Sequence, residues 1–285
     1  MKLNSLIYQE QQEVGDVKAM VEVYQEIAAM RMQSVKQAIL NARQYYESLA
    51  LLVREVRPWL RMSSNTTKSV SNTNKTISKT ALFFSANTGL YGDIIERTGR
   101  EFLAYIRGEQ SDAAVVGQAG KRIIESARTG RSITYFPCDD AHPTKDQIVA
   151  IVGYAQTFDH VEVFHGRFLN LVSQVPFRSS LTGENVVSHA LGTDWKKTSF
   201  FYLFEPTTAE ITTVIEGEVL ASVIEQILHE SNFSKFASRM IHLDRALEHI
   251  DERLDMIGRQ QRRMSRRMEN KKQLARLSGR LIWQT

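Results

Sequence analysis

The stretch that decides the fold is VKAMVEVYQEIAAMRMQSVKQAILNARQYYESLALLVREV, residues 17–56. Its side chains suited to a buried seam recur at alternating spacings of four and three residues, which is the heptad pattern of a coiled-coil helix. We expect this helix to begin near Ser5 or Val14 and to stop before Pro58, because a residue that precedes proline disfavours helical geometry. The predicted seam, with one polar member at Arg31, is Val17, Val21, Tyr24, Ala28, Arg31, Val35, Ala38, Ala42, Tyr45, Leu49, Leu52 and Val56.

The C-terminal part of the chain carries a second heptad seam, with one polar member at Gln261. Its members are Met240, Leu243, Leu247, Ile250, Leu254, Ile257, Gln261, Met264 and Met268. After Met268 the apolar pattern changes phase and resumes at Leu274, as in a coiled coil that loses its partner helix. A helix over 208–282 is longer than the first, so we expect an antiparallel two-helix shaft in which part of the second helix projects alone.

The composition allows a packed core and argues against several classes of protein. The chain has 285 residues, 42% hydrophobic residues and 24% charged residues, so disorder is not expected. No run approaches the roughly 20 apolar residues that cross a bilayer. Cys138 is the single cysteine, which excludes an intrachain disulfide, and the first ten residues do not resemble a signal peptide. We therefore expect a reducing compartment such as the cytoplasm.

A polar linker and a series of short strands and helices separate the two shaft segments. Of the 18 residues from 63 to 80, 13 are Ser, Thr or Asn, which is typical of a linker. We expect shaft segments over 1–62 and 207–285, a linker over 63–79, and a Rossmann-like α/β domain over 80–206. Its expected strands are 80–85, 112–117, 132–138, 161–169, 171–181 and 200–204, and its expected helices are 92–106, 118–128 and 144–158. The β-α-β-α-β-α order of the first six elements predicts a parallel sheet.

Two glycine-containing stretches look like nucleotide-binding motifs but lack the required spacing. Residues 117–122, GQAGKR, lack the G-x-x-x-x-G-K-[ST] spacing and the hydroxyl of a phosphate-binding loop. Residues 89–92, GLYG, lack the first pair of a dinucleotide-binding fingerprint. We interpret both as turns, and we expect no cofactor.

Candidate metal ligands gather in one loop, at Cys138, Asp139, Asp140 and His142. The loop also holds two prolines, and a plain surface loop is favoured over a metal site. His242 and His249 lie seven residues apart on the long helix, too far apart to share one ion without other ligands. Because no Ser, His and Asp set is evident either, we expect no catalytic residue in this chain.

The order helix, α/β insert, longer helix resembles the gamma subunit of rotary ATP synthases, and several short motifs support the resemblance. Residues 84–92 resemble the family's strand and G-L-C-G turn, with Tyr91 at the place of the cysteine. Residues 164–176 are similar to its N-K-F and Q-x-P elements, and residues 201–206 to its Y-x-Y-E-P element. Residues 224–231 and 237–240 resemble the start of its C-terminal helix, including A-A-R-M. The family-like positions include Gly89, Leu90, Gly92, Glu205, Pro206, Arg239 and Met240.

This resemblance implies a rotor that has no active site of its own. The shaft would turn inside a ring of alpha and beta subunits that carries the ATP sites. The α/β domain would form a foot that binds an epsilon-type subunit and the c-subunit ring, so that ion flow turns the shaft. The chain would then be peripheral, through its complex, at the cytoplasmic face of a bacterial inner membrane or its equivalent.

An arginine-rich stretch replaces the family's more mixed element in the last helix. Residues 259–280 hold nine Lys or Arg against one acid, while the chain as a whole is +4, so the remaining residues carry net negative charge. A solvated helix end is one interpretation. Contact with acidic surfaces of surrounding subunits is the favoured one, and its candidate residues are Arg262, Arg263, Arg266 and Arg267.

Two other functions remain open at this point. The first is a non-catalytic coiled-coil scaffold or a nucleic-acid-associated protein, although the basic stretch lacks base-stacking aromatic residues and nucleic acid is not the favoured partner. The second is the rotor of a rotary-type ATPase that is not devoted to ion transport.

Overall fold

The computed structural model describes residues 2–64, 78–89, 91–140, 143–182, 205 and 207–282. Most of the predicted linker, the predicted strand 200–204, Leu90, His142 and Pro206 lie outside these residues. The described elements include two very long helices, α1 (Lys2–Ser64) and α6 (Thr208–Ile282), of 63 and 75 residues. The chain divides into two compact units, one formed by Met1–Ala29 with Met240–Thr285 and the other by Met30–Arg239.

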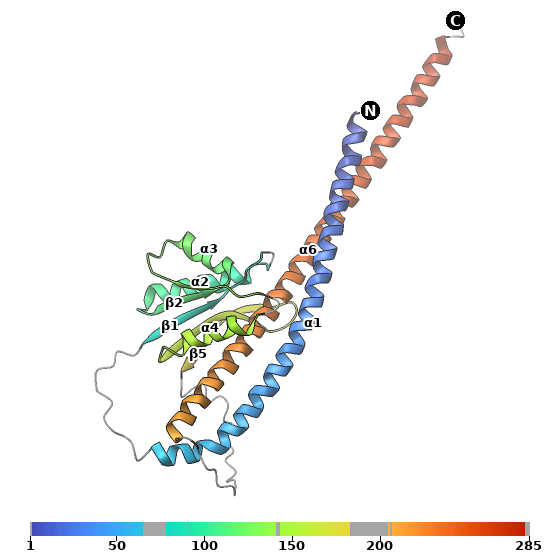
Figure 1. Cartoon of the computed structure of the whole chain (residues 1–285). Coiled ribbons are helices and arrows are strands. Elements are labelled where there is room, and N and C mark those ends of the chain that lie inside the picture. The colour runs from blue at the N-terminus through green and yellow to red at the C-terminus, as the bar shows by residue number, and fades with distance from the viewer. Residues whose placement is uncertain are drawn as a thin grey trace. The chain divides into compact units, whose positions relative to one another are not determined.

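In the first unit, α1 and α6 form an antiparallel pair (Figure 1). The direction follows from their contacts, because the partner's number rises along α6 as the number on α1 falls. Gln25 Nε2 donates to Asp244 Oδ1 over 3.3 Å, Lys18 Nζ lies 2.7 Å from Asp251 Oδ1, and Gln261 Nε2 donates to Gln11 Oε1 over 2.7 Å. These contacts confirm the predicted antiparallel two-helix shaft.

The protected face of α1 in this unit alternates apolar and polar positions at heptad spacing. Its apolar members are Ile7, Val14, Val21 and Ala28, of which Ile7 and Ala28 are buried. Its polar members are Gln11, Lys18 and Gln25, each of which contacts a polar side chain of α6. Since a polar pair at a seam position fixes register at some cost in stability, this pairing is specific as well as cohesive.

The second unit contains a mixed five-stranded sheet in the order β3-β2-β1-β4-β5. The strands are β1 (Lys79–Phe84), β2 (Asp112–Val116), β3 (Thr134–Phe136), β4 (His160–Phe168) and β5 (Gln174–Thr182). The strands β1 to β4 run parallel to one another, as predicted for the first strands of the domain. The edge strand β5 is antiparallel to β4 and forms a hairpin with it. A connection of five residues after Phe168 is too short for a parallel crossover, which explains the reversal.

Helices cover both faces of this sheet, and the alternation of side chains along β1 divides the core accordingly. Ala81 and Phe83 face α2 (Ile94–Gly108) and α3 (Gln118–Ala127), while Leu82 and Phe84 face α4 (Lys145–Ala155) and part of α6 (Figure 1). Every one of these four strand residues is buried. A parallel strand that is apolar on both faces is expected where helices cover both sides.

Both predicted boundaries of the first helix are wrong. The helix α1 does not stop before Pro58 but continues to Ser64, and it begins at Lys2 rather than near Ser5 or Val14. Proline removes one backbone donor and disturbs the carbonyl one turn earlier, which weakens a helix without always ending it. In contrast, the predicted bounds of the last helix, 208–282, are confirmed.

Candidate functional site

A polar cluster with a buried centre joins α6 to the carboxyl ends of the sheet strands, and we call it the joint cluster. It consists of Asn87, Thr88 and Tyr91 after β1, Asp140 after β3, and Lys235 and Arg239 on α6. Parallel strands end at one edge, so loops that are distant in sequence meet there. All of these residues belong to the second unit.

The centre of the joint cluster is the ion pair between Lys235 and Asp140. Lys235 Nζ lies 3.3 Å from Asp140 Oδ1 and donates to Ser85 O over 2.7 Å, and both side chains are almost completely buried, with 3% and 6% exposed. Burial lowers the pKa of Lys235, since desolvation penalises the ammonium, while the carboxylate opposes that effect. The attraction between the two charges offsets their desolvation only because further hydrogen bonds satisfy the remaining donors and acceptors of the pair.

The second oxygen of Asp140 holds the loop after β1. Asp140 Oδ2 accepts hydrogen bonds from Asn87 N over 2.9 Å, from Thr88 N over 3.1 Å and from Tyr91 Oη over 3.1 Å. Burial, reinforced by the neighbouring carboxylate, raises the pKa of Tyr91 to about 12, so its hydroxyl stays protonated and donates. The carboxylate therefore fixes both the loop and the helix.

Arg239 completes the cluster. Its Nη2 donates to Gly89 O over 2.5 Å, and its guanidinium carbon lies 4.2 Å from the centre of the Tyr91 ring, close enough for a cation–π contact. That ring packs edge to face with Phe236, with 5.9 Å between the centroids. These contacts of Arg239, together with the Lys235–Asp140 pair, fasten α6 to the loops at the carboxyl ends of the strands.

The turn at residues 117–120 uses its backbone donors within the protein. Gly117 N donates to Phe136 O, Gln118 N to Asn87 Oδ1, Ala119 N to Ala86 O and Gly120 N to Ser85 Oγ. Gly117 has φ of +97°, and a Cβ at Gly120 would lie 2.5 Å from Ser85 Oγ, so both positions require glycine. These amides are the ones that a phosphate would need, and they are already engaged.

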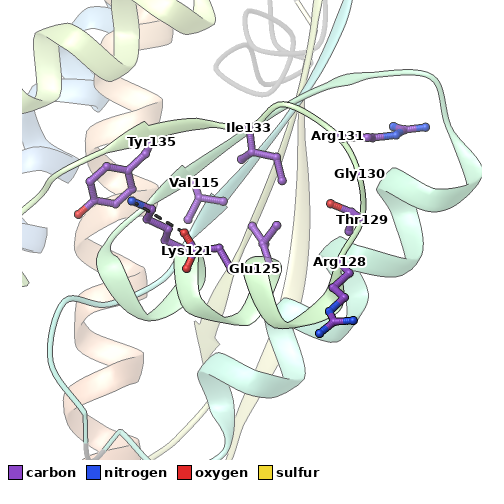
Figure 2. A pocket seen from close by; sticks show the side chains of 10 residues that line it. Val115, Lys121, Glu125, Arg128, Thr129, Gly130, Arg131, Ile133 and Tyr135 are labelled. Atoms are coloured by element: carbon purple, nitrogen blue, oxygen red, sulfur yellow. Dashed lines mark ion pairs between the residues drawn. The ribbon is translucent and has the colours of Figure 1, made fainter.

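A pocket of about 280 Å³ lies between α3 and the segment leading to β3 (Figure 2). Val115, Ile124 and Ile133 line it with apolar groups, and Lys121 pairs with Glu125 over 3.9 Å and lies 5.2 Å from the centre of the Tyr135 ring. The side chains of Arg128 and Arg131 point away from the pocket in Figure 2. Its charged groups therefore do not converge on a common ligand position.

The candidate metal ligands do not form a site within the described part of the chain. No group of three or more His, Cys, Asp or Glu side chains with metal-binding geometry occurs there. Asp140 belongs to the joint cluster, and burial raises the pKa of the Cys138 thiol to about 11. His249 is exposed and lies 3.8 Å from Glu252, so its near neighbour is a carboxylate of its own helix.

The seam residues are distributed unequally in the structure. On α6, Leu243 and Ile257 are buried and Met240, Leu247, Ile250 and Leu254 are half-buried. On α1, Val21, Ala28, Val35 and Leu49 are buried or half-buried, whereas Val17, Tyr24 and Leu52 are 49%, 41% and 50% exposed. The neighbours Lys18, Gln25 and Val53 occupy the protected face instead, so at these three positions the protected face lies one residue further along.

The remaining predicted positions fall in two regions. Arg262, Arg263, Arg266 and Arg267 are exposed on α6. Beyond the half-buried Met264, every residue from 265 to 277 is exposed. Gly89 and Arg239 lie in the joint cluster, Gly92 has φ of +64°, and Glu205 is exposed. The predicted site residues do not include Lys235, and the predicted plain surface loop holds Asp140, which lies in the joint cluster instead. A lysine within the serine-rich and apolar run 231–240 is the sequence signal that its ammonium has a buried partner.

The described helices include none that is long and apolar enough to cross a membrane. Similarity to known proteins covers most of the chain. The ATP synthase gamma chain of Parvibaculum lavamentivorans is 24% identical, covering 93% of this chain and 95% of the relative, and that of Rhodopseudomonas palustris strain HaA2 is 25% identical over 83% of each.

Solved structures with the same fold include the central stalk of the Tetrahymena thermophila mitochondrial ATP synthase. It has a TM-score of 0.59 at 18% identity and covers 80% of this chain and 99% of that one. A chain of the Euglena gracilis mitochondrial ATP synthase in rotational state 3 has a TM-score of 0.51 at 12% identity, over 93% of each chain. The model of the family described as ATP synthase matches residues 6–267, and this chain therefore belongs to the ATP synthase gamma-subunit family.

Proposed function

We propose that this chain is the central rotor shaft of a rotary ATP synthase or ATPase, which couples ion flow through a membrane sector to ATP synthesis or hydrolysis. The observation that carries the proposal is the family match over residues 6–267, which spans both long helices and the domain between them. The antiparallel pairing of α1 with α6 supplies the stiff element that transmission of torque requires.

The chain acts as a mechanical part, and its partners carry the catalytic residues. Alpha and beta subunits form the surrounding ring, while an epsilon-type subunit and the c-subunit ring bind the α/β domain. An asymmetric shaft contacts the catalytic subunits differently, so that shaft angle and nucleotide occupancy bias each other reciprocally. The joint cluster supports this role because it fastens α6 to the domain through a buried ion pair. The complex makes the chain a peripheral component at the cytoplasmic face of a bacterial inner membrane or its equivalent.

The test is purification of the complex through an affinity tag on this chain. We expect alpha, beta, epsilon-type and c subunits to co-purify, with ATP hydrolysis that drives ion pumping after reconstitution into vesicles. Recovery of the chain alone or with nucleic acid supports the scaffold alternative and contradicts the proposal. Hydrolysis without ion pumping by an intact reconstituted complex supports a rotary ATPase with another task.

A further inference from the structure

A groove of about 570 Å³ lies in the second unit between α1, α6 and the end of β4. Its floor is apolar, with Ile39 half-buried and Leu40 46% exposed on α1. On the opposite wall the rings of Phe168 and Phe233 meet edge to face, with 4.6 Å between their centroids. The groove thus exposes apolar side chains among charged ones, and another protein segment gains free energy by burying such apolar surface.

The tip of the β4–β5 hairpin, which follows Phe168 directly in the sequence, also exposes apolar side chains. Leu169, Leu171 and Val172 are 55%, 52% and 77% exposed at its tip. The tip is held by Asn170, whose Oδ1 accepts hydrogen bonds from Val172 N over 3.0 Å and Ser173 N over 2.7 Å. A preorganised loop that presents apolar side chains to water loses little conformational entropy when a partner covers it.

The charges around the groove favour an acidic partner. Arg43 pairs with Glu47 over 2.9 Å, and Arg167 lies 3.7 Å from Glu230. Lys36 also lines the groove, and no ion pair of its ammonium occurs within the described part of the chain. The groove therefore carries one positive charge in excess, at its Lys36 end, next to apolar side chains.

We propose that this groove and the hairpin tip dock an amphipathic helix of another subunit of the complex, with apolar side chains against Leu40 and Phe168 and a carboxylate facing Lys36. The α1 wall runs from Lys36 to Glu47, or about 16 Å at 1.5 Å per residue, which matches three turns of a partner helix. Recognition of an amphipathic helix by an apolar groove is a recurrent mode of binding. The inference rests on the proposed function, because the partner must belong to the complex.

The first experiment places the photoreactive residue p-benzoylphenylalanine at Leu40, or at Leu171, in the purified complex. Leu51 on α1, which is 58% exposed and does not line the groove, is the matched control position. We expect both test positions to crosslink to one amphipathic, acid-bearing helix of another subunit, identified by mass spectrometry of the joined peptides. Crosslinks to a second copy of this chain, to a basic or non-helical segment, or to nothing overturn the inference.

The second experiment tests the charge with Lys36→Glu, with Lys36→Arg as the conservative variant and Lys121→Glu as a charge reversal outside the groove. Lys121 is exposed, and its side chain lies at the separate pocket on α3. We expect Lys36→Glu to reduce the crosslink yield from Leu40 about tenfold, which corresponds to about 1.4 kcal/mol of docking free energy, with little change in the other two variants. An unchanged yield in Lys36→Glu contradicts the acidic partner. Failure of the complex to assemble around the unmodified chain would instead contradict the proposed rotor function.

Discussion

At the scale of single residues, the pair Asp140–Lys235 shows how a long helix acquires a fixed place on the sheet. A buried ion pair costs desolvation, and its attraction repays that cost only when the remaining donors and acceptors are satisfied. Here the Lys235 ammonium donates a second hydrogen bond to Ser85 O, and Asn87, Thr88 and Tyr91 donate hydrogen bonds to the Asp140 carboxylate. The pair therefore contributes specificity, because no other register of α6 brings an ammonium to this carboxylate.

Removal of one partner should be strongly destabilising. We expect Lys235→Met to lower the free energy of unfolding by about 3 to 5 kcal/mol, because it leaves the Asp140 carboxylate buried without its cation. The double variant Lys235→Met, Asp140→Asn should lose less than the sum of the two single changes. Urea denaturation of the full chain measures both. Lys121→Met removes the exposed pair with Glu125 and is the control, with an expected loss below about 1 kcal/mol.

His165 gives the second residue-scale prediction, through the pH dependence of stability. It is 1% exposed on β4, and its Nε2 lies 3.0 Å from Ser179 Oγ. Burial lowers its pKa from 6.5 to about 4, so the unfolded chain binds the proton more readily than the folded one between these values. Stability from this residue is complete above pH 6.5 and is lost as the pH falls toward 4, by about 3 kcal/mol in total.

His165→Gln tests this dependence, since glutamine has no proton to gain in this range. The measurement is the free energy of unfolding by urea at pH 7 and at pH 4.5, for the wild type and for the variant. We expect the wild type to lose about 2 kcal/mol more than the variant between the two pH values. Equal losses would mean that the imidazole is solvated in the folded protein.

At the scale of elements, the α1 seam differs from the simple heptad reading for a physical reason. Apolar periodicity selects Val17 and Tyr24, yet the structure turns Lys18 and Gln25 toward α6, where they meet Asp251 and Asp244. A polar seam position cannot be predicted from the apolar pattern of α1 alone, because the carboxylates that pair with it lie more than 200 residues away in sequence. The α6 seam is apolar in most layers, and there the pattern and the protected face agree.

Among the other elements, some could be predicted from local sequence, whereas others depend on tertiary structure. The strands β1 and β2 could be predicted because apolar runs bounded by turns and helices suffice to indicate them. The antiparallel direction of β5 depends on the length of its connection to β4, and the continuation of α1 through Pro58 depends on tertiary packing. Intrinsic residue propensities contain neither kind of information. The joint cluster could not be predicted as a set, since Asp140 and Lys235 meet only after the sheet and α6 have formed.

Substitutions along the seam test this arrangement. We expect Val35→Asp to cost about 3 to 5 kcal/mol, because Val35 is 3% exposed within an apolar cluster, and Leu254→Asp about 1 to 2 kcal/mol at its half-buried position. Val17→Asp is the matched control, and it should change the free energy of unfolding by less than about 0.5 kcal/mol. Thermal and urea melts of the three variants test which residues of α1 face α6. A large loss of stability in Val17→Asp would mean that Val17, and not Lys18, lies on the protected face.

At the scale of the whole molecule, positive charge is concentrated toward the C-terminal end of α6. Nine Lys or Arg lie within 259–280, while the rest of the chain is net negative. The arginines 262, 263, 266 and 267 are exposed, so their charges are screened by salt over about 8 Å at physiological ionic strength. A solvated surface of this density is more than one helix end requires, and in the proposed rotor it faces acidic segments of the beta subunits.

The last prediction concerns these four arginines in the assembled complex. Single changes to Ala should have little effect, because each exposed pair is worth about 0 to 1 kcal/mol. Replacement of all four should weaken the coupling between ATP hydrolysis and ion pumping while the α/β domain stays folded, and high salt should reproduce part of that loss in the wild type. Circular dichroism checks the fold, and the two rates are measured in reconstituted vesicles. The control changes Lys121, Arg122, Arg128 and Arg131 to Ala, the same loss of charge on exposed side chains near α3. If hydrolysis, pumping and their ratio match the wild type from low to high salt, the arginine stretch is a solvated helix face and takes no part in coupling.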